Sequence, residues 1–354
     1  MRRTLLHSML MLSESDVKRV LTMKDCLQVN RLAFQAVAAD TAQVPTRLGL
    51  AYADPGVSNS SSSEAAQDWT LFKPAAYQTK ERDHMGLKVV SIRSNNGKRG
   101  LPLVPASILS LHPSTGMVQA VVAGTYLTAM RTATGSALSA QLLRPDAAHI
   151  VVFGAGLQAE LHVQALATAL EKSLPLVTLI NRTRSRAEAL QSTLEATDWV
   201  DHVHVVDLSD RLKVAETLAT ADVVVTATNT ATPLFDGSLL RPGTHIAGVG
   251  SYTPDMQEIS ARTVDRCKVL IDTPEARTVG DLKNVSMSHP VALLGDLLQC
   301  QDENRENEWM NKNSSPFDCT FFKSVGTAIQ DVLTADLVVQ KSKEQNIGLE
   351  VDMS

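Results

Sequence analysis

One short stretch decides the fold predicted for this chain: His149-Ile-Val-Val-Phe-Gly-Ala-Gly-Leu-Gln-Ala159. The apolar residues predict a buried strand, and the G-x-G-x-x-A spacing predicts a tight turn that opens a helix. Gly154 allows the turn, Gly156 leaves room for a pyrophosphate beside the backbone, and Ala159 lets the helix pack closely on the strand. The first amides of such a helix face an anion. A dinucleotide site is therefore predicted at Gly154, Ala155, Gly156, Leu157 and Gln158.

The residues after the next strand indicate which dinucleotide is bound. That strand, Leu176-Val-Thr-Leu-Ile180, lies at βαβ distance and is followed by Asn181-Arg-Thr-Arg184. An NAD site usually has an acidic residue here, which binds the ribose 2′-hydroxyl. Guanidinium and hydroxyl groups bind a 2′-phosphate instead, so NADP(H) is predicted rather than NAD(H), held by Asn181, Arg182, Thr183 and Arg184. The alternative is that these arginines and Arg186 form a solvated first helical turn, although arginines there oppose the helix dipole and favour a bound anion.

Composition argues against several classes of partner. Hydrophobic residues make up 44% of the 354 residues, which supports a large core, and the net charge of −5 with mixed signs argues against nucleic acid. No apolar run has the length of a membrane span. The four cysteines lack C-x-x-C spacing, so no metal site and no disulfide framework are expected, and reduced thiols favour the cytoplasm. Residues 5–12 partly resemble a signal peptide, which leaves import into an organelle as the alternative.

The pattern of predicted elements changes near residue 149. Upstream, a first strand, a helix over 16–39 capped by Ser13, and a hairpin around His112-Pro-Ser-Thr-Gly116 predict a β-rich domain. Downstream, strands near 149–153, 176–180, 202–206, 222–226, 244–248 and 268–272 alternate with helices, which is typical of a doubly wound parallel sheet. A last helix near 326–343 is expected to return to the first domain. The predicted fold class is therefore α/β, with a Rossmann-type domain at 129–320 and a discontinuous α+β domain at 1–128 and 321–354.

Five segments resemble, in order and spacing, the ornithine cyclodeaminase and mu-crystallin family. They are Met130-Arg-Thr-Ala-Thr-Gly-Ser-Ala137, Phe153-Gly-Ala-Gly-Leu-Gln-Ala159, Ile180-Asn-Arg-Thr183, Arg241-Pro-Gly-Thr-His-Ile-Ala-Gly-Val-Gly-Ser251 and Phe322-Lys-Ser-Val-Gly-Thr-Ala-Ile-Gln-Asp331. The resemblance implies that the discontinuous domain binds substrate and forms a homodimer, while the Rossmann-type domain holds the nicotinamide cofactor. It also implies hydride transfer between nicotinamide and the α-carbon of an amino acid or its cyclic imine. The chain departs from the family in a serine-rich loop at 54–63, a polar segment at 301–316 and a longer tail.

An amino- or imino-acid substrate carries a carboxylate, so its pocket needs fixed cations. The resemblance places substrate-binding cations at Arg47, Lys88 and Arg131, and makes Lys88 and Arg131 the candidate catalytic residues. Arg131 suits bidentate carboxylate binding at a helix start. Lys88 lies on an apolar strand, where burial makes it a candidate proton donor. The alternatives are a surface arginine at 47, a solvated strand-edge lysine at 88 and a structural ion pair at 131.

Further binding residues follow the later strands. Open α/β sheets bind ligands at the carboxyl ends of their strands, so the nicotinamide is expected to be bordered by Thr226, Ala227, Thr228 and Val249. Ser324, Val325 and Gly326 match the family segment beside the substrate, with a helix N-cap as the alternative for Ser324. Lys323 is expected to pack along the surface.

One departure from the family distinguishes between its activities. Members that cyclodeaminate ornithine carry an aspartate that meets the substrate amino group, whereas this chain has Tyr252 there, with Asp255 close behind. Without that carboxylate, a diamino substrate loses its charge partner in a buried site. We therefore predict NADPH-dependent reduction of a cyclic imino acid such as pyrroline- or piperideine-2-carboxylate. The alternatives are an ornithine or lysine cyclodeaminase that uses NAD, a protein that binds NADPH and a small ligand without turnover, and a biosynthetic enzyme that condenses or oxidises an amino acid.

Overall fold

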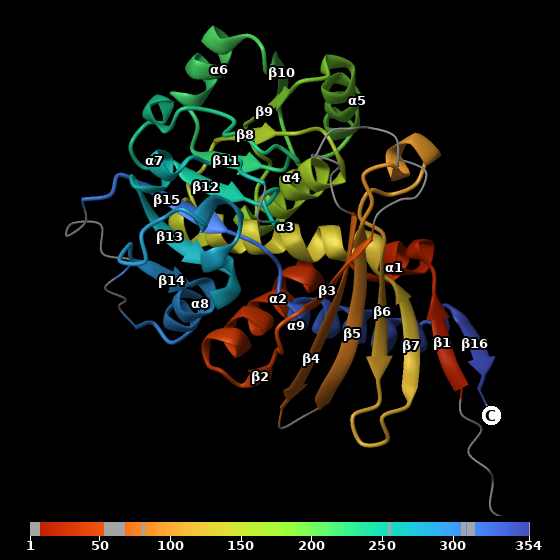
Figure 1. The fold of residues 1–354 in the computed structure, drawn as a ribbon. Coiled ribbons are helices and arrows are strands. Elements are labelled where there is room, and N and C mark those ends of the chain that lie inside the picture. Colours follow the sequence, from red (N-terminus) through yellow and green to blue (C-terminus); the bar gives the residue numbers. More distant parts are fainter. Residues whose placement is uncertain are drawn as a thin grey trace, which may run out of the picture. The chain divides into compact units, whose positions relative to one another are not determined.

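The computed structural model describes residues 8–52, 68–79, 82–253, 256–305, 309 and 316–353. Its contacts divide the chain into two compact units (Figure 1). Unit 1 contains Met1–Thr22, Asp40–Thr128 and Thr327–Ser354, and unit 2 contains Met23–Ala39 and Ala129–Gly326. The serine-rich segment at 54–63 and Asp255 lie outside the described residues, and so do residues 306–308 and 310–315 of the polar segment.

Unit 2 is built on a parallel sheet with the strand order β10-β9-β8-β11-β12-β15-β13-β14. Its strands are β8 (His149–Phe153), β9 (Leu176–Asn181), β10 (Val203–Asp207), β11 (Val223–Thr226), β12 (His245–Gly248), β13 (Cys267–Ile271), β14 (Val291–Leu293) and β15 (Cys319–Lys323). The chain leaves β8 toward β9 and later pairs β11 with the other side of β8, so the strand order reverses at β8. The predicted α/β class, the Rossmann-type parallel sheet and the six predicted strands are confirmed, whereas β14 and β15 were not predicted.

Helices complete unit 2 and cover both faces of the middle of its sheet (Figure 1). They are α2 (Met23–Ala38), α4 (Leu157–Leu170), α5 (Arg184–Glu195), α6 (Arg211–Leu218), α7 (Ala261–Val264) and α8 (Leu294–Asp302), together with α3 (Gly124–Leu143) from Ala129 onward. In β8, the four residues from Ile150 to Phe153 are fully buried. A continuous apolar strand of this kind is typical of a parallel sheet with both faces covered. In the described part of the chain, none of the helices combines the length and the apolar character that crossing a membrane requires.

Two segments lie in a different unit from the one expected. The sequence grouped residues 23–39 and 321–326 with the first domain, but both belong to unit 2. β15 lies between β12 and β13, so its residues are an integral part of the parallel sheet. Helix α2 packs on α8, where Arg31 Nη2 lies 2.7 Å from Asp302 Oδ1. The helix expected over 16–39 is accordingly two helices, α1 (Glu14–Val20) and α2, because Leu21 adopts an extended backbone that ends α1.

Unit 1 contains a mostly antiparallel sheet in the order β16-β1-β7-β6-β5-β4-β2, with β3 paired to β4. Its strands are β1 (Ser8–Leu12), β2 (Ala42–Gln43), β3 (Leu48–Tyr52), β4 (Asp68–Gln78), β5 (Asp83–Ile92), β6 (Ala106–Leu111), β7 (Val118–Ala123) and β16 (Leu349–Asp352). Helix α9 (Ala328–Glu344) packs across β4 to β7. Gly86 permits this approach, since a Cβ there would lie 2.8 Å from the Leu109 carbonyl oxygen and 3.0 Å from Val332. The β6–β7 hairpin, the Ser13 capping box and the last helix are as predicted, whereas β16 was not predicted.

Two buried histidines tie helices of unit 2 to one another and to its sheet. His245 on β12 lies 2.9 Å from Ser139 Oγ on α3 and 2.8 Å from Thr320 Oγ1 on β15. His162 on α4 donates its Nδ1–H to the Gln158 carbonyl at 2.6 Å, and its Nε2 lies 3.0 Å from Ser136 Oγ. Burial lowers the pKa of His162 to about 4 and that of His245 to about 3. Both rings are therefore neutral in the folded protein at neutral pH.

We expect the free energy of unfolding to fall as the pH drops from about 6.5 toward about 4. Both histidines have a depressed pKa in the folded state, so below the ordinary histidine pKa of about 6.5 the unfolded chain binds protons that the folded chain does not. Each histidine contributes a slope of up to about 1.4 kcal/mol per pH unit in this window. Urea unfolding at pH 7, 6 and 5 measures the slope, and His162→Gln should reduce it. An equal slope in wild type and variant would contradict the assignment.

Candidate cofactor and substrate site

The glycine turn after β8 is held against the loop after β11. Gly154 has φ +115°, a backbone conformation that side chains disfavour. A Cβ at this position would lie 2.7 Å from the Ala227 carbonyl oxygen. Only glycine therefore lets the turn and the Thr226–Thr228 loop approach this closely, and the approach lies at the point where the strand order reverses.

The start of α4 has the features of a pyrophosphate site. Gly156 is its N-cap and makes no side-chain capping bond, and a Cβ on Gly156 would meet no atom of the described residues within 4 Å. Gly156 and Leu157 are exposed. The first amides of a 14-residue helix thus face open space, where the helix dipole favours an anion. These residues fit the pyrophosphate of a dinucleotide, and Gly154, Ala155, Gly156, Leu157 and Gln158 lie together in this turn.

The cationic segment predicted for the adenosine end follows β9, the neighbour of β8. Arg182, Thr183 and Arg184 are exposed, and Asn181 Nδ2 donates to the Thr183 carbonyl at 2.8 Å. Thr183 is the N-cap of α5 and makes no side-chain capping bond. Arg184 Nε lies 2.7 Å from Glu188 Oε1, in a pair that is about half exposed on both sides. Arginine side chains thus stand in solvent at a helix N-terminus, as a phosphate site requires.

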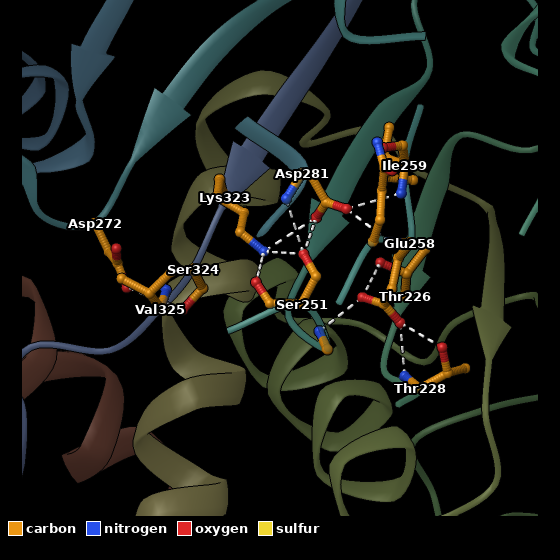
Figure 2. A network of polar contacts seen from close by, with 12 residues as sticks. Thr226, Thr228, Ser251, Glu258, Ile259, Asp272, Asp281, Lys323, Ser324 and Val325 are labelled. Carbon is orange, nitrogen blue, oxygen red and sulfur yellow. Dashed lines mark hydrogen bonds and ion pairs between the residues drawn. The ribbon is translucent and has the colours of Figure 1, made fainter. Parts of the chain in front are cut away.

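On the other side of β8, a buried carboxylate organises the loops after β11 and β12 (Figure 2). The side chain of Glu258 is fully buried. Its Oε1 accepts from the Thr228 amide and hydroxyl, both at 2.7 Å, and its Oε2 accepts from the Thr226 hydroxyl at 2.8 Å and the Gly250 amide at 2.7 Å. Burial raises the pKa of this carboxyl, partly opposed by the Thr228 and Thr226 hydrogen bonds. Glu258 therefore fixes the segments that contain Thr226, Ala227, Thr228 and Val249.

A buried ion pair supports Glu258 from the end of β15. Lys323 Nζ lies 3.0 Å from Asp281 Oδ2, and both side chains are fully buried. Lys323 also donates to the carbonyl and the hydroxyl of Ser251. Asp281 Oδ1 accepts from the amides of Glu258 and Ile259 at 2.7 and 2.9 Å. The expectation of a surface Lys323 was wrong, because β15 is an internal strand that directs this side chain to Asp281. Sequence reasoning also missed Glu258 and Asp281.

A second buried carboxylate holds the segment Ser324, Val325 and Gly326 in place. Asp272 Oδ2 accepts from the Ser324 hydroxyl at 3.1 Å and from the Val325 and Gly326 amides at 2.8 and 2.6 Å. Gly326 has φ +77°, and a Cβ there would lie 2.8 Å from Arg131 Nη2. The structure thus brings Arg131 together with this segment. The expected helix-start position of Arg131 is wrong, because α3 begins at Gly124 and Arg131 lies in its interior. The helix cap considered for Ser324 is wrong, because Thr327 is the N-cap of α9 and its amide donates to Gln330 Oε1 at 3.1 Å.

Lys88 and Arg47 lie in unit 1. Lys88 is on β5, an internal strand, and its Nζ lies 2.7 Å from Asp331 Oδ2 in the first turn of α9. The two side chains are 1% and 0% exposed, so the alternative of a solvated strand-edge lysine is wrong. Lys73 on β4 faces Lys88 in register and is also buried. Arg47 precedes β3 and is half-buried. In the part of the chain that the structure describes, no cluster of three or more His, Cys, Asp or Glu residues is arranged to hold a metal ion.

The model of the ornithine cyclodeaminase/mu-crystallin family matches residues 8–346. The chain belongs to this family. It is therefore an enzyme of the NAD(P)-dependent oxidoreductases and cyclodeaminases that make up the family, and it uses a nicotinamide cofactor and a small-molecule substrate. The segments on which the resemblance was based include the turn at Gly154, the Arg131 helix and the Lys323–Gly326 segment.

Known members differ in their activities. The chain is 28% identical to an uncharacterised cyclodeaminase of Dictyostelium discoideum, over 98% of this chain and 100% of that protein. It is 30% identical to the ketimine reductase mu-crystallin of Mus musculus, over 74% and 77% of the two chains. The solved structure of Thermococcus litoralis Δ1-pyrroline-2-carboxylate reductase, in complex with NADH and L-proline, matches with a TM-score of 0.82 and 27% identity, over 97% of this chain and 100% of that one.

Two glycine variants test whether each glycine is required for the stability of the fold or for the binding of the cofactor. Gly154→Ala should destabilise the fold by about 1–3 kcal/mol, because its Cβ meets the Ala227 carbonyl in a strained backbone conformation. Gly156→Ala should leave the melting temperature nearly unchanged, since its Cβ meets open space, but should weaken nicotinamide cofactor binding about tenfold. Thermal unfolding and fluorescence titration measure the two effects. Unchanged cofactor affinity in a folded Gly156→Ala protein would contradict the pyrophosphate assignment.

Proposed function

We propose that this protein is an NADPH-dependent reductase of cyclic imino acids, ketimines such as pyrroline- or piperideine-2-carboxylate. The observation that carries the proposal is the buried Arg131 guanidinium against the Ser324–Gly326 segment, which Asp272 holds in place. A guanidinium fixed in this way is suited to a substrate carboxylate. The names of the mouse ketimine reductase and the Thermococcus reductase support imine reduction as the reaction.

The cofactor residues divide by position along the sheet edge. The turn Gly154–Gln158 would hold the pyrophosphate through the α4 amides, and Asn181, Arg182, Thr183 and Arg184 would hold the 2′-phosphate of NADPH. Thr226, Ala227, Thr228 and Val249 would border the nicotinamide ring, on loops fixed by Glu258. When bound, the cofactor supplies a hydride for the imine carbon. The protein's own contribution is to orient the two reactants and exclude water.

The substrate residues would supply charge and a proton. Arg131 binds the carboxylate in bidentate fashion, assisted by Arg47 and Lys88. The Lys88 ammonium is paired with Asp331, which fixes its direction. A protonated imine is the better hydride acceptor, so Lys88 is proposed as the donor of that proton. Ser324, Val325 and Gly326 line the carboxylate end of the substrate.

Tyr252 argues against a cyclodeaminase activity, which is the activity that the name of the Dictyostelium relative indicates. Burial, and then the Glu258 charge, raise the pKa of the Tyr252 phenol, so it stays neutral. A neutral phenol provides no charge partner for the side-chain ammonium of ornithine or lysine. Net reduction also draws on NADPH, in keeping with the arginines after β9. A location in the cytoplasm stays a prediction.

We also propose a homodimer formed through the second face of the unit 1 sheet. Leu87, Leu109 and Val121 align across β5, β6 and β7, opposite in direction to the buried Lys88, Ile108 and Val122. The three are only half-buried, and the aligned Met11 on β1 is 43% exposed. A contiguous apolar sheet face of this kind is typical of an interface.

The reductase is tested by mixing the protein with NADPH and a cyclic ketimine and following the absorbance of the reduced cofactor. We expect oxidation of NADPH, and we expect Arg182→Ala to lower the NADPH-over-NADH preference about tenfold, because a charged hydrogen bond to the 2′-phosphate is lost. Arg186→Ala, at an exposed arginine in the first turn of α5, is the matched control and should keep the preference. No oxidation with any ketimine overturns the assignment. Ammonia release from ornithine with catalytic NAD would establish the cyclodeaminase.

The dimer is tested by light scattering. Wild type should have twice the 38.2 kDa mass of one chain, and Val121→Glu should reduce the mass to that of a monomer, because a carboxylate in an apolar interface is costly to desolvate. Leu212→Glu, at a 70% exposed position on α6, is the control and should stay dimeric. A monomeric wild type, or a dimeric Val121→Glu protein, would rule out this interface.

A further inference from the structure

Glu258 is a buried carboxylate whose described hydrogen-bond partners are all neutral donors. Its two oxygens accept hydrogen bonds from the Thr226 hydroxyl, the Thr228 hydroxyl and amide, and the Gly250 amide (Figure 2). Among the described residues, no Lys, Arg or His forms an ion pair with it. Two of its four donors are backbone amides, which can only donate, as suits an ionised carboxylate.

The nearest buried cation is already committed to another carboxylate. Lys323 pairs with Asp281 and donates to Ser251, and Asp281 in turn accepts from the Glu258 amide. The network therefore contains two carboxylates and one ammonium, all fully buried. Screening by solvent is weak at such sites, so the excess negative charge acts over several ångströms.

The position of this charge relative to the dinucleotide site follows from the sheet. The pyrophosphate turn at Gly154 lies against the Ala227 carbonyl, and the arginines of the adenosine end follow β9 on one side of β8. A dinucleotide that crosses the point at β8 where the strand order reverses extends its nicotinamide half over β11 and β12. Glu258 binds residues at the carboxyl ends of those two strands. They are Thr226 at the end of β11, Thr228 just after β11, and Gly250 after β12.

We propose that Glu258 is a fixed anion that makes the protein favour the oxidised over the reduced nicotinamide. The reduced ring is neutral and the oxidised ring carries one positive charge, so a buried negative charge beside it stabilises the oxidised form selectively. The same charge favours hydride donation to the imine, because positive charge grows on the ring as the hydride, with its two electrons, leaves for the imine carbon. This inference rests on the proposed function for its cofactor and extends it to the energetics of that site.

The competing explanation is that Glu258 only positions its loops. A purely positioning residue would affect the binding of both redox forms alike, because the two forms share the same pyrophosphate, ribose and carboxamide groups. An electrostatic residue changes the ratio of the two dissociation constants. The ratio therefore distinguishes the explanations without any measurement of turnover.

The experiment compares the dissociation constants of NADP⁺ and NADPH, and of NAD⁺ and NADH, by calorimetry in the absence of substrate. In Glu258→Gln, binding of the oxidised form should weaken about tenfold more than binding of the reduced form, as expected for the loss of one charge several ångströms away in a medium of intermediate dielectric constant. Thr226→Val is the matched control, because it removes one hydrogen bond to Glu258 and keeps the charge. It should change both constants by the same factor.

Asp281→Asn provides a second test if Glu258→Gln does not fold. It removes the other carboxylate while its side-chain carbonyl can still accept from the Glu258 and Ile259 amides, and it should shift the ratio in the same direction. An unchanged ratio in a folded variant of either kind overturns the proposal and leaves the reductase assignment intact. Normal cofactor binding without reduction of any ketimine would overturn the reductase assignment alone, while absence of binding by either redox form would overturn both.

Discussion

The close approach of Gly154 to the Ala227 carbonyl is the constraint on which the rest of unit 2 depends. A side chain at this position would lie within 2.7 Å of that oxygen, so the turn after β8 and the loop after β11 form one surface only because residue 154 is glycine. This surface lies where the strand order reverses, and the α4 amides open beside it. The arginines after β9 and the Glu258 network after β11 and β12 are placed on its two sides. The cofactor site proposed at this edge thus depends on one steric contact.

Most of the fold of unit 2 could be predicted because its signals are local. Apolar strands and the glycine spacing are read within windows of about ten residues, and six strands were found this way. The exceptions depend on long-range packing. β15 was missed because its assignment depends on pairing with β12 and β13. The break at Leu21 was missed because helical periodicity continues through it, although α1 and α2 belong to different units.

The candidate site likewise contains some residues that local motifs predict and others that depend on long-range packing. Arg131 and the Ser324–Gly326 segment could be named from family motifs, and the structure brings them together. The three carboxylates that hold the site, Glu258, Asp272 and Asp281, were not found. Acidic residues are usually exposed, and nothing in their immediate sequence marks these as buried. Lys323 and Asp281 are 42 residues apart, so neither predicts the burial of the other. Pairing across such a separation becomes visible only in the folded protein.

Two of these carboxylates act on consecutive residues of one strand end. Lys323 extends its side chain to Asp281 (Figure 2), while the Ser324 hydroxyl and the two amides that follow it donate to Asp272. Buried carboxylates are costly to desolvate, and an apolar core would stabilise the fold at least as well. Their presence is better explained by geometry, because hydrogen bonds to a buried charge allow little displacement. β15 thereby holds both the segment beside Arg131 and the loops bound by Glu258 in fixed positions. The proposed hydride transfer requires preorganisation of this kind.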